Sequence, residues 1–259
     1  MDEAGYSETE YAEYRNIVYS WIFLNEVITT IFKDEPPGFF VEAGALDGEY
    51  LSNTLDLERK HNWTGLLVET DSEMFKSIKN KNRKSWISHS CLAAFPYPYQ
   101  TTLVKFTNHL SASKEFSLAV RGFNAIMESK DLGERLIAGF PVYETAQCFP
   151  LQTLLLAINV TYVNFISLDV EGVEMRVLDA FWGSQITVDV WIVEHKHSDS
   201  VLGSNDSLDS KFIHWFQSKG YTLYTYGFYS PVDYVFIRNG SNISARAFSE
   251  RPKKYVKNY

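Results

Sequence analysis

The chain has few of the features that direct proteins into membranes or onto nucleic acids. It contains no run of 18 apolar residues, so the sequence predicts no membrane span. Lysines and arginines number 24 against 32 aspartates and glutamates, giving a net charge of -8. Because phosphate binding depends on basic side chains, this balance argues against a nucleic-acid partner. The longest basic cluster, residues 79–84, is expected at a solvated helix end.

Cysteine is also scarce, and the sequence does not decide in which cellular compartment the protein lies. Cys91 and Cys148 can form a disulfide if they meet in space, and two buried thiols are equally compatible with the sequence. Residues 1–14 lack the basic start and apolar run of a signal peptide, which favours a cytoplasmic location. The alternative is the lumen of the secretory pathway, because five Asn-x-Ser/Thr sequences occur where about two are expected by chance. These begin at Asn62, Asn159, Asn205, Asn239 and Asn242.

With 259 residues, 45% of them hydrophobic, the chain is long enough for one large α/β domain with a covered core. Residues 38–240 are expected to form this domain, with an insertion at about 107–149 that carries substrate specificity or covers a sheet edge. Residues 1–37 are interpreted as a tail and a helix, because apolar side chains recur every three or four positions over residues 17–32. That helix packs across the sheet or forms a lid. Residues 241–259 are expected to be a C-terminal tail.

Strand and helix patterns alternate along the domain. Apolar runs predict strands, listed in order as 39–42, 65–68, 86–92, 162–168, 188–193, 220–228 and 232–238. Helical spacing predicts helices at 50–60, from 72, 150–158, 173–181 and 208–218. Residues 102–106 favour an extra hairpin strand, and 129–137 a further helix. The predicted fold class is α/β, a Rossmann-like class I methyltransferase layout, with a seven-stranded, mostly parallel sheet and helices on both faces.

The organising motif follows the first strand. Gly44 and Gly48 permit a tight turn and the close approach of a ligand, although they can also simply turn the chain. Glu69 ends the next strand about 20 residues later, where a carboxylate can accept hydrogen bonds from both ribose hydroxyls. The G-x-G-x-x-G spacing of dinucleotide-binding proteins is missing, and Glu42 and Asp47 make the turn negative. Such a site suits S-adenosylmethionine, which is positively charged, better than a pyrophosphate.

Three segments, 41–48, 67–69 and 167–174, resemble the FkbM-type methyltransferase family, and 148–151 with 193–194 are most similar to its Star-like arthropod branch. The resemblance implies S-adenosyl-L-methionine as the cofactor and methylation of a hydroxyl on a small molecule or sugar. The Star-like branch implies an alternative, a catalytically silent module that binds a protein partner in trafficking. Cofactor contacts are expected from Glu42, Gly44, Ala45, Asp47, Gly48, Glu69, Asp71, Cys91, Leu92 and Asp169.

Catalytic candidates lie at the ends of later strands. Removing a proton from an alcohol needs a carboxylate or histidine nearby, and Asp169 is the first choice as base or orienting group, unless it only caps the following helix. Glu171 and His195 are the further candidates. His195 and His197 alternate near Glu194, but this pattern is more typical of a polar strand end than of a metal site, so no metal is predicted.

Overall fold

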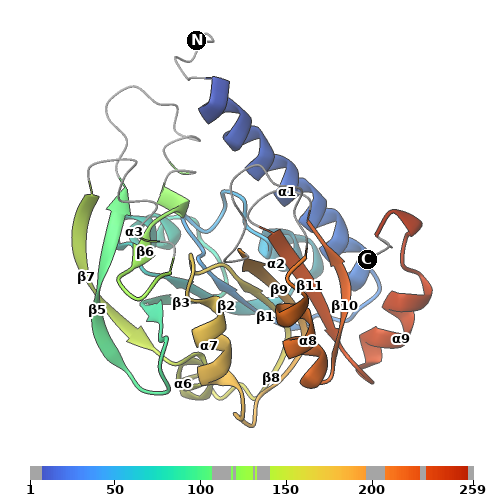
Figure 1. Ribbon diagram of the computed structural model, residues 1–259. Coiled ribbons are helices and arrows are strands. Elements are labelled where there is room, and N and C mark those ends of the chain that lie inside the picture. Colours follow the sequence, from blue (N-terminus) through green and yellow to red (C-terminus); the bar gives the residue numbers. More distant parts are fainter. Residues whose placement is uncertain are drawn as a thin grey trace.

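A seven-stranded sheet forms the centre of the protein (Figure 1). The computed structural model describes residues 8–106, 118, 121–130, 132, 141–196, 208–227 and 232–255. The strands of the main sheet are β1 (Phe39–Ala43), β2 (Thr64–Glu69), β3 (Trp86–His89), β8 (Tyr162–Leu168), β9 (Thr187–His195), β10 (Tyr221–Tyr226) and β11 (Val232–Arg238). Their order is β10-β11-β9-β8-β1-β2-β3, and only β11 is antiparallel to its neighbours. The predicted fold class is confirmed.

Helices cover both faces of this sheet because successive strand residues point to opposite sides. In β9, Trp191 and Val193 join a core with α6, α7 and α8, whereas Val190 and Ile192 join a core with α1, α2, α3 and α9. The helices are α1 (Glu8–Phe32), α2 (Leu55–His61), α3 (Ser72–Lys79), α6 (Leu151–Ala157), α7 (Glu174–Phe181), α8 (Ser210–Ser218) and α9 (Asn242–Ser249), followed by a 3₁₀ turn (Lys253–Tyr255). Within the described residues, no helix is both long and apolar enough to cross a membrane.

A second sheet of four strands flanks the first, in the order β4-β7-β5-β6. Its strands are β4 (Cys91–Leu92), β5 (Tyr99–Phe106), β6 (Ala125–Ile126) and β7 (Pro141–Phe149). The extra hairpin strand expected at 102–106 is therefore present and longer. The single strand expected at 86–92 is wrong, because the chain leaves the main sheet after β3 and pairs Cys91 with Cys148 instead. The helix expected at 129–137 lies mostly outside the described residues.

Cys91 and Cys148 form a disulfide that joins β4 to β7. The two cysteines are 57 residues apart in sequence and almost fully buried, 3% and 0% exposed. The bond therefore ties the second sheet together at the end nearest the main sheet. Of the two possibilities that the sequence left open, a disulfide and two buried thiols, the structure shows the disulfide.

The ends of the chain contribute more than expected. Helix α1 begins at Glu8 and packs Leu24 and Ile31 into the core. The residues expected to be a C-terminal tail contain α9, whose Arg246 donates hydrogen bonds to the Ile31 carbonyl (2.7 Å) and to Glu35 (2.6 Å). Tyr255 is only 1% exposed. The packed body therefore extends past residue 240.

Removing the disulfide should destabilise the fold. For a closed loop of 57 residues, we expect the Cys91→Ala/Cys148→Ala double variant to lose about 4 kcal/mol of unfolding free energy, mainly through the freer unfolded chain. Urea denaturation checks this, with reduced and oxidised wild type as the control. Equal midpoints for the double variant and the oxidised wild type would contradict the expectation.

Candidate functional site

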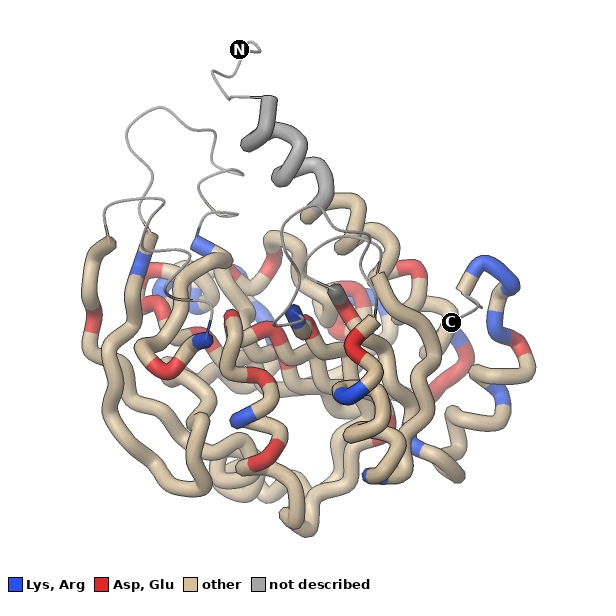
Figure 2. The backbone as a smooth tube through the Cα atoms, in the orientation of Figure 1, with Lys and Arg blue, Asp and Glu red and all other residues tan. Residues whose placement is uncertain are grey.

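A pocket of about 210 Å³ opens at the carboxyl ends of the central strands. β1 and β8 are neighbours in the sheet, but the chain continues from β1 to β2 on one side and from β8 to β9 on the other. Open α/β sheets bind ligands where the strand order reverses in this way. Residues in or directly after the carboxyl ends of β1, β2, β4, β8 and β9 line the pocket, together with residues of α1 and of the segment 121–126. Figure 2 shows several acidic positions in the middle of the fold, around the ends of these strands.

The turn after β1 forms one wall and depends on glycine at Gly44. This residue has φ +84°, and a Cβ added to it would lie 2.1 Å from the backbone oxygen of Asp169. Gly48 also has a positive φ, +80°. Of the turn residues predicted to contact the cofactor, only Gly44 lines the pocket. Leu46, which was not predicted, lines it as well. Ala45 is buried in the core with α1 and α2. The turn therefore brings its backbone, more than its side chains, to the cavity.

Glu42 and Asp47 hold this turn in shape and do not line the pocket. The carboxylate of Glu42 accepts hydrogen bonds from the hydroxyls of Ser52 (2.8 Å) and Thr54 (2.6 Å) and from the N–H of Asn53 (2.7 Å). These contacts use residues 52–54, which explains why the helix expected over 50–60 begins only at Leu55. Asp47 accepts from the N–H groups of the two residues that follow Gly48. Both acids point away from the cavity, unlike the sequence-based expectation.

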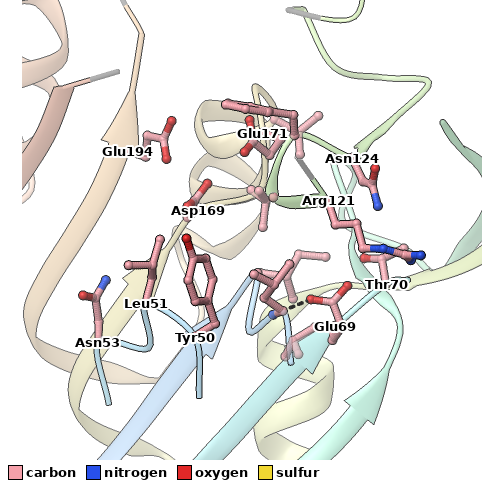
Figure 3. A pocket seen from close by; sticks show the side chains of 18 of the residues that line it. Tyr50, Leu51, Asn53, Glu69, Thr70, Arg121, Asn124, Asp169, Glu171 and Glu194 are labelled. Atoms are coloured by element: carbon pink, nitrogen blue, oxygen red, sulfur yellow. Dashed lines mark hydrogen bonds between the residues drawn. The ribbon is translucent and has the colours of Figure 1, made fainter. Parts of the chain in front are cut away.

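Glu69 lies at the end of β2 and does line the pocket (Figure 3). One carboxylate oxygen accepts from the N–H of Leu46 and the other from the N–H of Asp71, both at 2.7 Å. Burial raises the pKa of Glu69 to about 7. Each oxygen has a second lone pair, so the carboxylate can still accept two hydrogen bonds from a ligand.

Cys91 and Leu92, which the sequence expects to contact the cofactor, line the pocket, and with Leu103 and Ile126 of the second sheet they make an apolar wall. Asp71 does not line it. Its carboxylate caps α3 through two N–H groups and is paired with Lys105 and Arg121, each at 3.3 Å.

Across the pocket from Glu69, three carboxylates converge: Asp169, Glu171 and Glu194 (Figure 3). One oxygen from each lies within 4.8 Å of the others, so the three could hold a divalent cation. Burial, followed by the charge of Glu171, raises the pKa of Asp169 well above its usual range. Burial and the charge of Asp169 do the same to the pKa of Glu194. Since like charges this close resist ionisation, burial and the neighbouring acids both favour the protonated form of a carboxyl in this cluster.

The turn that carries Glu171 is held from below by Glu174. One carboxylate oxygen of Glu174 accepts from the N–H groups of Gly172 (2.9 Å) and Val170 (3.2 Å). Glu174 is 3% exposed, and burial raises its pKa to about 7. Glu171 itself adopts φ +58°.

Positive φ values at side-chain-bearing residues gather at this pocket. Leu46 (φ +51°), Leu51 (φ +53°) and Glu171 all line it. Such conformations cost of order 1–3 kcal/mol each and cluster at functional sites, where the surrounding structure holds them.

His195 does not lie in the pocket. It is 6% exposed, stacks on Phe212 of α8 with ring centres 4.0 Å apart, and its Nε2 is 3.0 Å from Asp209. The side chain points to the α8 face of β9, whereas Glu194, one residue earlier, points into the pocket. The expectation of His195 as a base near Asp169 is thus not met, and His197 lies outside the described residues.

Helix α1 covers the pocket, which was one of the two roles that the sequence left open for this helix. Its residues Ile17, Ser20, Trp21 and Leu24 line the pocket. The Ser20 hydroxyl donates to Asp233 of β11 (2.6 Å), and the Trp21 indole N–H donates to the carbonyl of Ser52 (3.2 Å). The helical stripe in the sequence pointed to this helix, and the structure shows that it both packs on the sheet and covers the cavity.

Comparison with known proteins agrees with this geometry. A family model described as the methyltransferase FkbM domain matches residues 42–223, which run from β1 into β10. No curated protein matches the chain. The match does not distinguish a Star-like branch within the family.

Gly44→Ala should lower the free energy of unfolding far more than a glycine-to-alanine change at another position with positive φ. We expect about 1 kcal/mol from the positive φ and about 1–3 kcal/mol more from the clash with Asp169. Gly220→Ala is the matched control, because Gly220 has φ +85° with no atom within 4 Å of an added Cβ. Thermal unfolding measures both variants, and equal losses of stability would show that β1 and β8 do not approach as described.

The protein should lose stability as pH rises from about 5 to 8. The pKa of Glu174 is about 7 in the folded protein and near 4.5 in the unfolded chain, so the unfolded chain releases its proton first and is favoured at higher pH. Because each pKa unit corresponds to about 1.4 kcal/mol, Glu174→Gln should reduce this fall by up to about 3 kcal/mol.

Urea denaturation at pH 5 and pH 8 measures this difference. Asp179→Asn, at an exposed position on the same helix, is the matched control and should keep the wild-type difference. An unchanged pH dependence in Glu174→Gln would contradict the assignment.

Proposed function

The chain belongs to the FkbM family of S-adenosylmethionine-dependent methyltransferases, and from this premise we propose that it methylates a hydroxyl group of a small molecule or sugar. One observation carries the proposal: Glu69 and Asp169 face one pocket from opposite sides of the Gly44 turn. A group suited to ribose and a group suited to proton transfer therefore meet in a single cavity.

The residues on the donor side fit S-adenosylmethionine. Glu69 has acceptor capacity left for two ribose hydroxyls, and Leu92, Leu103 and Ile126 offer apolar contact for the adenine. Gly44 lines the pocket with its backbone, against which the methionine portion would lie. The acids of the pocket favour a ligand with positive charge and disfavour a pyrophosphate, although they are not Glu42 and Asp47, the acids from which the sequence predicted this preference.

Asp169 is the proposed proton acceptor. When bound, S-adenosylmethionine supplies an electrophilic methyl group on a positively charged sulfur. The acceptor hydroxyl must lose its proton as the new bond forms, and a carboxylate whose pKa is raised by burial takes a proton more readily than an exposed one. Glu194 lies beside Asp169 in the same cluster of acids, and Trp21 and Ile17 of α1 restrict water.

A catalytically silent, Star-like partner-binding module is the second candidate. The observation in its favour is Leu46, which lines the pocket and is a bulky residue in the loop against which the cofactor would lie. The two candidates differ in whether S-adenosylmethionine binds at all, so a binding measurement separates them.

Glu69→Gln should weaken the binding of S-adenosylmethionine by about tenfold or more, because hydrogen bonds to a charged group contribute about 1.5–3 kcal/mol. Isothermal titration with S-adenosylmethionine and S-adenosylhomocysteine at pH 8, where Glu69 is ionised, measures this. Asp179→Asn is the control and should bind like the wild type. Unchanged affinity in Glu69→Gln would move the ribose elsewhere, and no binding to the wild type at high micromolar concentration would favour the silent module.

Asp169→Asn should lower turnover by about 100-fold or more while leaving the affinity for S-adenosylhomocysteine unchanged. The assay follows formation of S-adenosylhomocysteine with a panel of hydroxylated acceptors, chosen first by their activity with the wild type. Asp179→Asn again serves as the control. A fully active Asp169→Asn enzyme would assign proton removal to another group.

A further inference from the structure

Four of the five Asn-x-Ser/Thr sequences fall on described residues, and in each of the four the asparagine is exposed. These asparagines are Asn62, Asn159, Asn239 and Asn242. An oligosaccharide attached at any of them would extend into solvent, as N-linked glycans require.

All four lie at the same pole of the molecule. Asn62 precedes β2 and Asn159 precedes β8, so both sit at the amino ends of parallel strands. Asn239 and Asn242 follow β11, which runs antiparallel to the other strands. Because Arg238 at the end of β11 pairs with Tyr221, the first residue of β10, these two asparagines also lie at the amino ends of the parallel strands. The pocket opens at the opposite ends of these strands. In Figure 1 this pole includes α6 and the start of β8, at the bottom of the view.

Two of the four sequences are the most open. In Asn62-Trp63-Thr64 and Asn159-Val160-Thr161 the asparagine and the threonine are both exposed, and each asparagine ends a helical segment with φ +58°. By contrast, Asn239 accepts a hydrogen bond from the Thr222 hydroxyl at 2.7 Å, and the hydroxyl residue of its sequence, Ser241, is buried as the cap of α9.

The disulfide is an independent observation about the compartment. Cys91 and Cys148 are the only cysteines of the chain, and both are committed to one buried bond. Disulfides of this kind form in oxidising compartments such as the endoplasmic reticulum and are rare in the cytosol. N-linked glycans are added in that same compartment.

We propose that Asn62 and Asn159 are N-glycosylated in an oxidising secretory compartment, where the Cys91–Cys148 disulfide also forms. In glycosylation the side-chain amide nitrogen bonds to the anomeric carbon of a lipid-diphosphate-linked oligosaccharide. The bond from that carbon to the diphosphate breaks, the lipid diphosphate leaves and the amide loses one proton. For the disulfide, the two thiols release two protons and two electrons to a thiol–disulfide oxidoreductase. Neither step depends on the methyltransferase proposal.

The placement keeps the modification compatible with the pocket. Glycans at Asn62 and Asn159 lie at the far end of the strands from Glu69 and Asp169. They would therefore cover the amino-end pole and leave the pocket, at the carboxyl ends of the strands, uncovered.

The test isolates the full-length gene product from its own cells, without any added signal sequence. Digestion with peptide-N-glycosidase should increase its gel mobility and convert the occupied asparagines to aspartate, which peptide mass spectrometry detects. We expect conversion at both Asn62 and Asn159, and loss of the mobility change in the Asn62→Gln/Asn159→Gln double variant. Thr64→Ala with Thr161→Ala should have the same effect while keeping both asparagines.

Asn82→Gln is the matched control, because Asn82 is also exposed with φ +53° but lies outside any Asn-x-Ser/Thr sequence. It should keep the wild-type mobility change. Alkylation of the denatured protein should label both cysteines only after reduction. Unmodified Asn62 and Asn159, or cysteines that react without reduction, would overturn the proposal.

Discussion

The close approach of Gly44 to the carbonyl of Asp169 is the contact on which the site depends. A Cβ at Gly44 would lie 2.1 Å from that oxygen, so the ends of β1 and β8 meet only because residue 44 has no side chain. The same turn then places the N–H of Leu46 on Glu69. One glycine thus brings together the ends of β1, β2 and β8, and with them the two carboxylates to which we assign binding and proton transfer.

Burying so many acids is costly, and the protein offsets this cost mainly with backbone N–H groups. Glu69 accepts two of them and Glu174 accepts two, yet burial still raises the pKa of each to about 7. Burial and the neighbouring acids raise the pKa values of Asp169 and Glu194 as well. The pocket is therefore lined by acids that favour a cationic ligand and hold protons more tightly than exposed carboxyls do.

Much of the fold was predictable because parallel strands buried on both faces leave apolar runs, and because an acid closes several of them. The partners of each side chain were less predictable. His195 and Glu194 differ by one residue, and only the strand's neighbours decide which of them faces α8 and which the pocket. Glu42 resembles a ligand-binding residue in sequence, but its carboxylate accepts hydrogen bonds from two hydroxyls and one backbone N–H of the next turn. Such long-range choices leave no periodic signal.

The second sheet links the covalent state of the chain to the pocket. Cys91 lines the cavity beside Leu92, and its sulfur is bonded to Cys148 on β7, the strand that also carries Glu144, a partner of Lys105. Lys105 in turn pairs with Asp71, whose N–H binds Glu69. The apolar wall and the carboxylate opposite Asp169 are therefore fixed by the same four strands. The disulfide therefore belongs to the same sheet as the apolar wall of the pocket and as Lys105, which pairs with Asp71 beside Glu69.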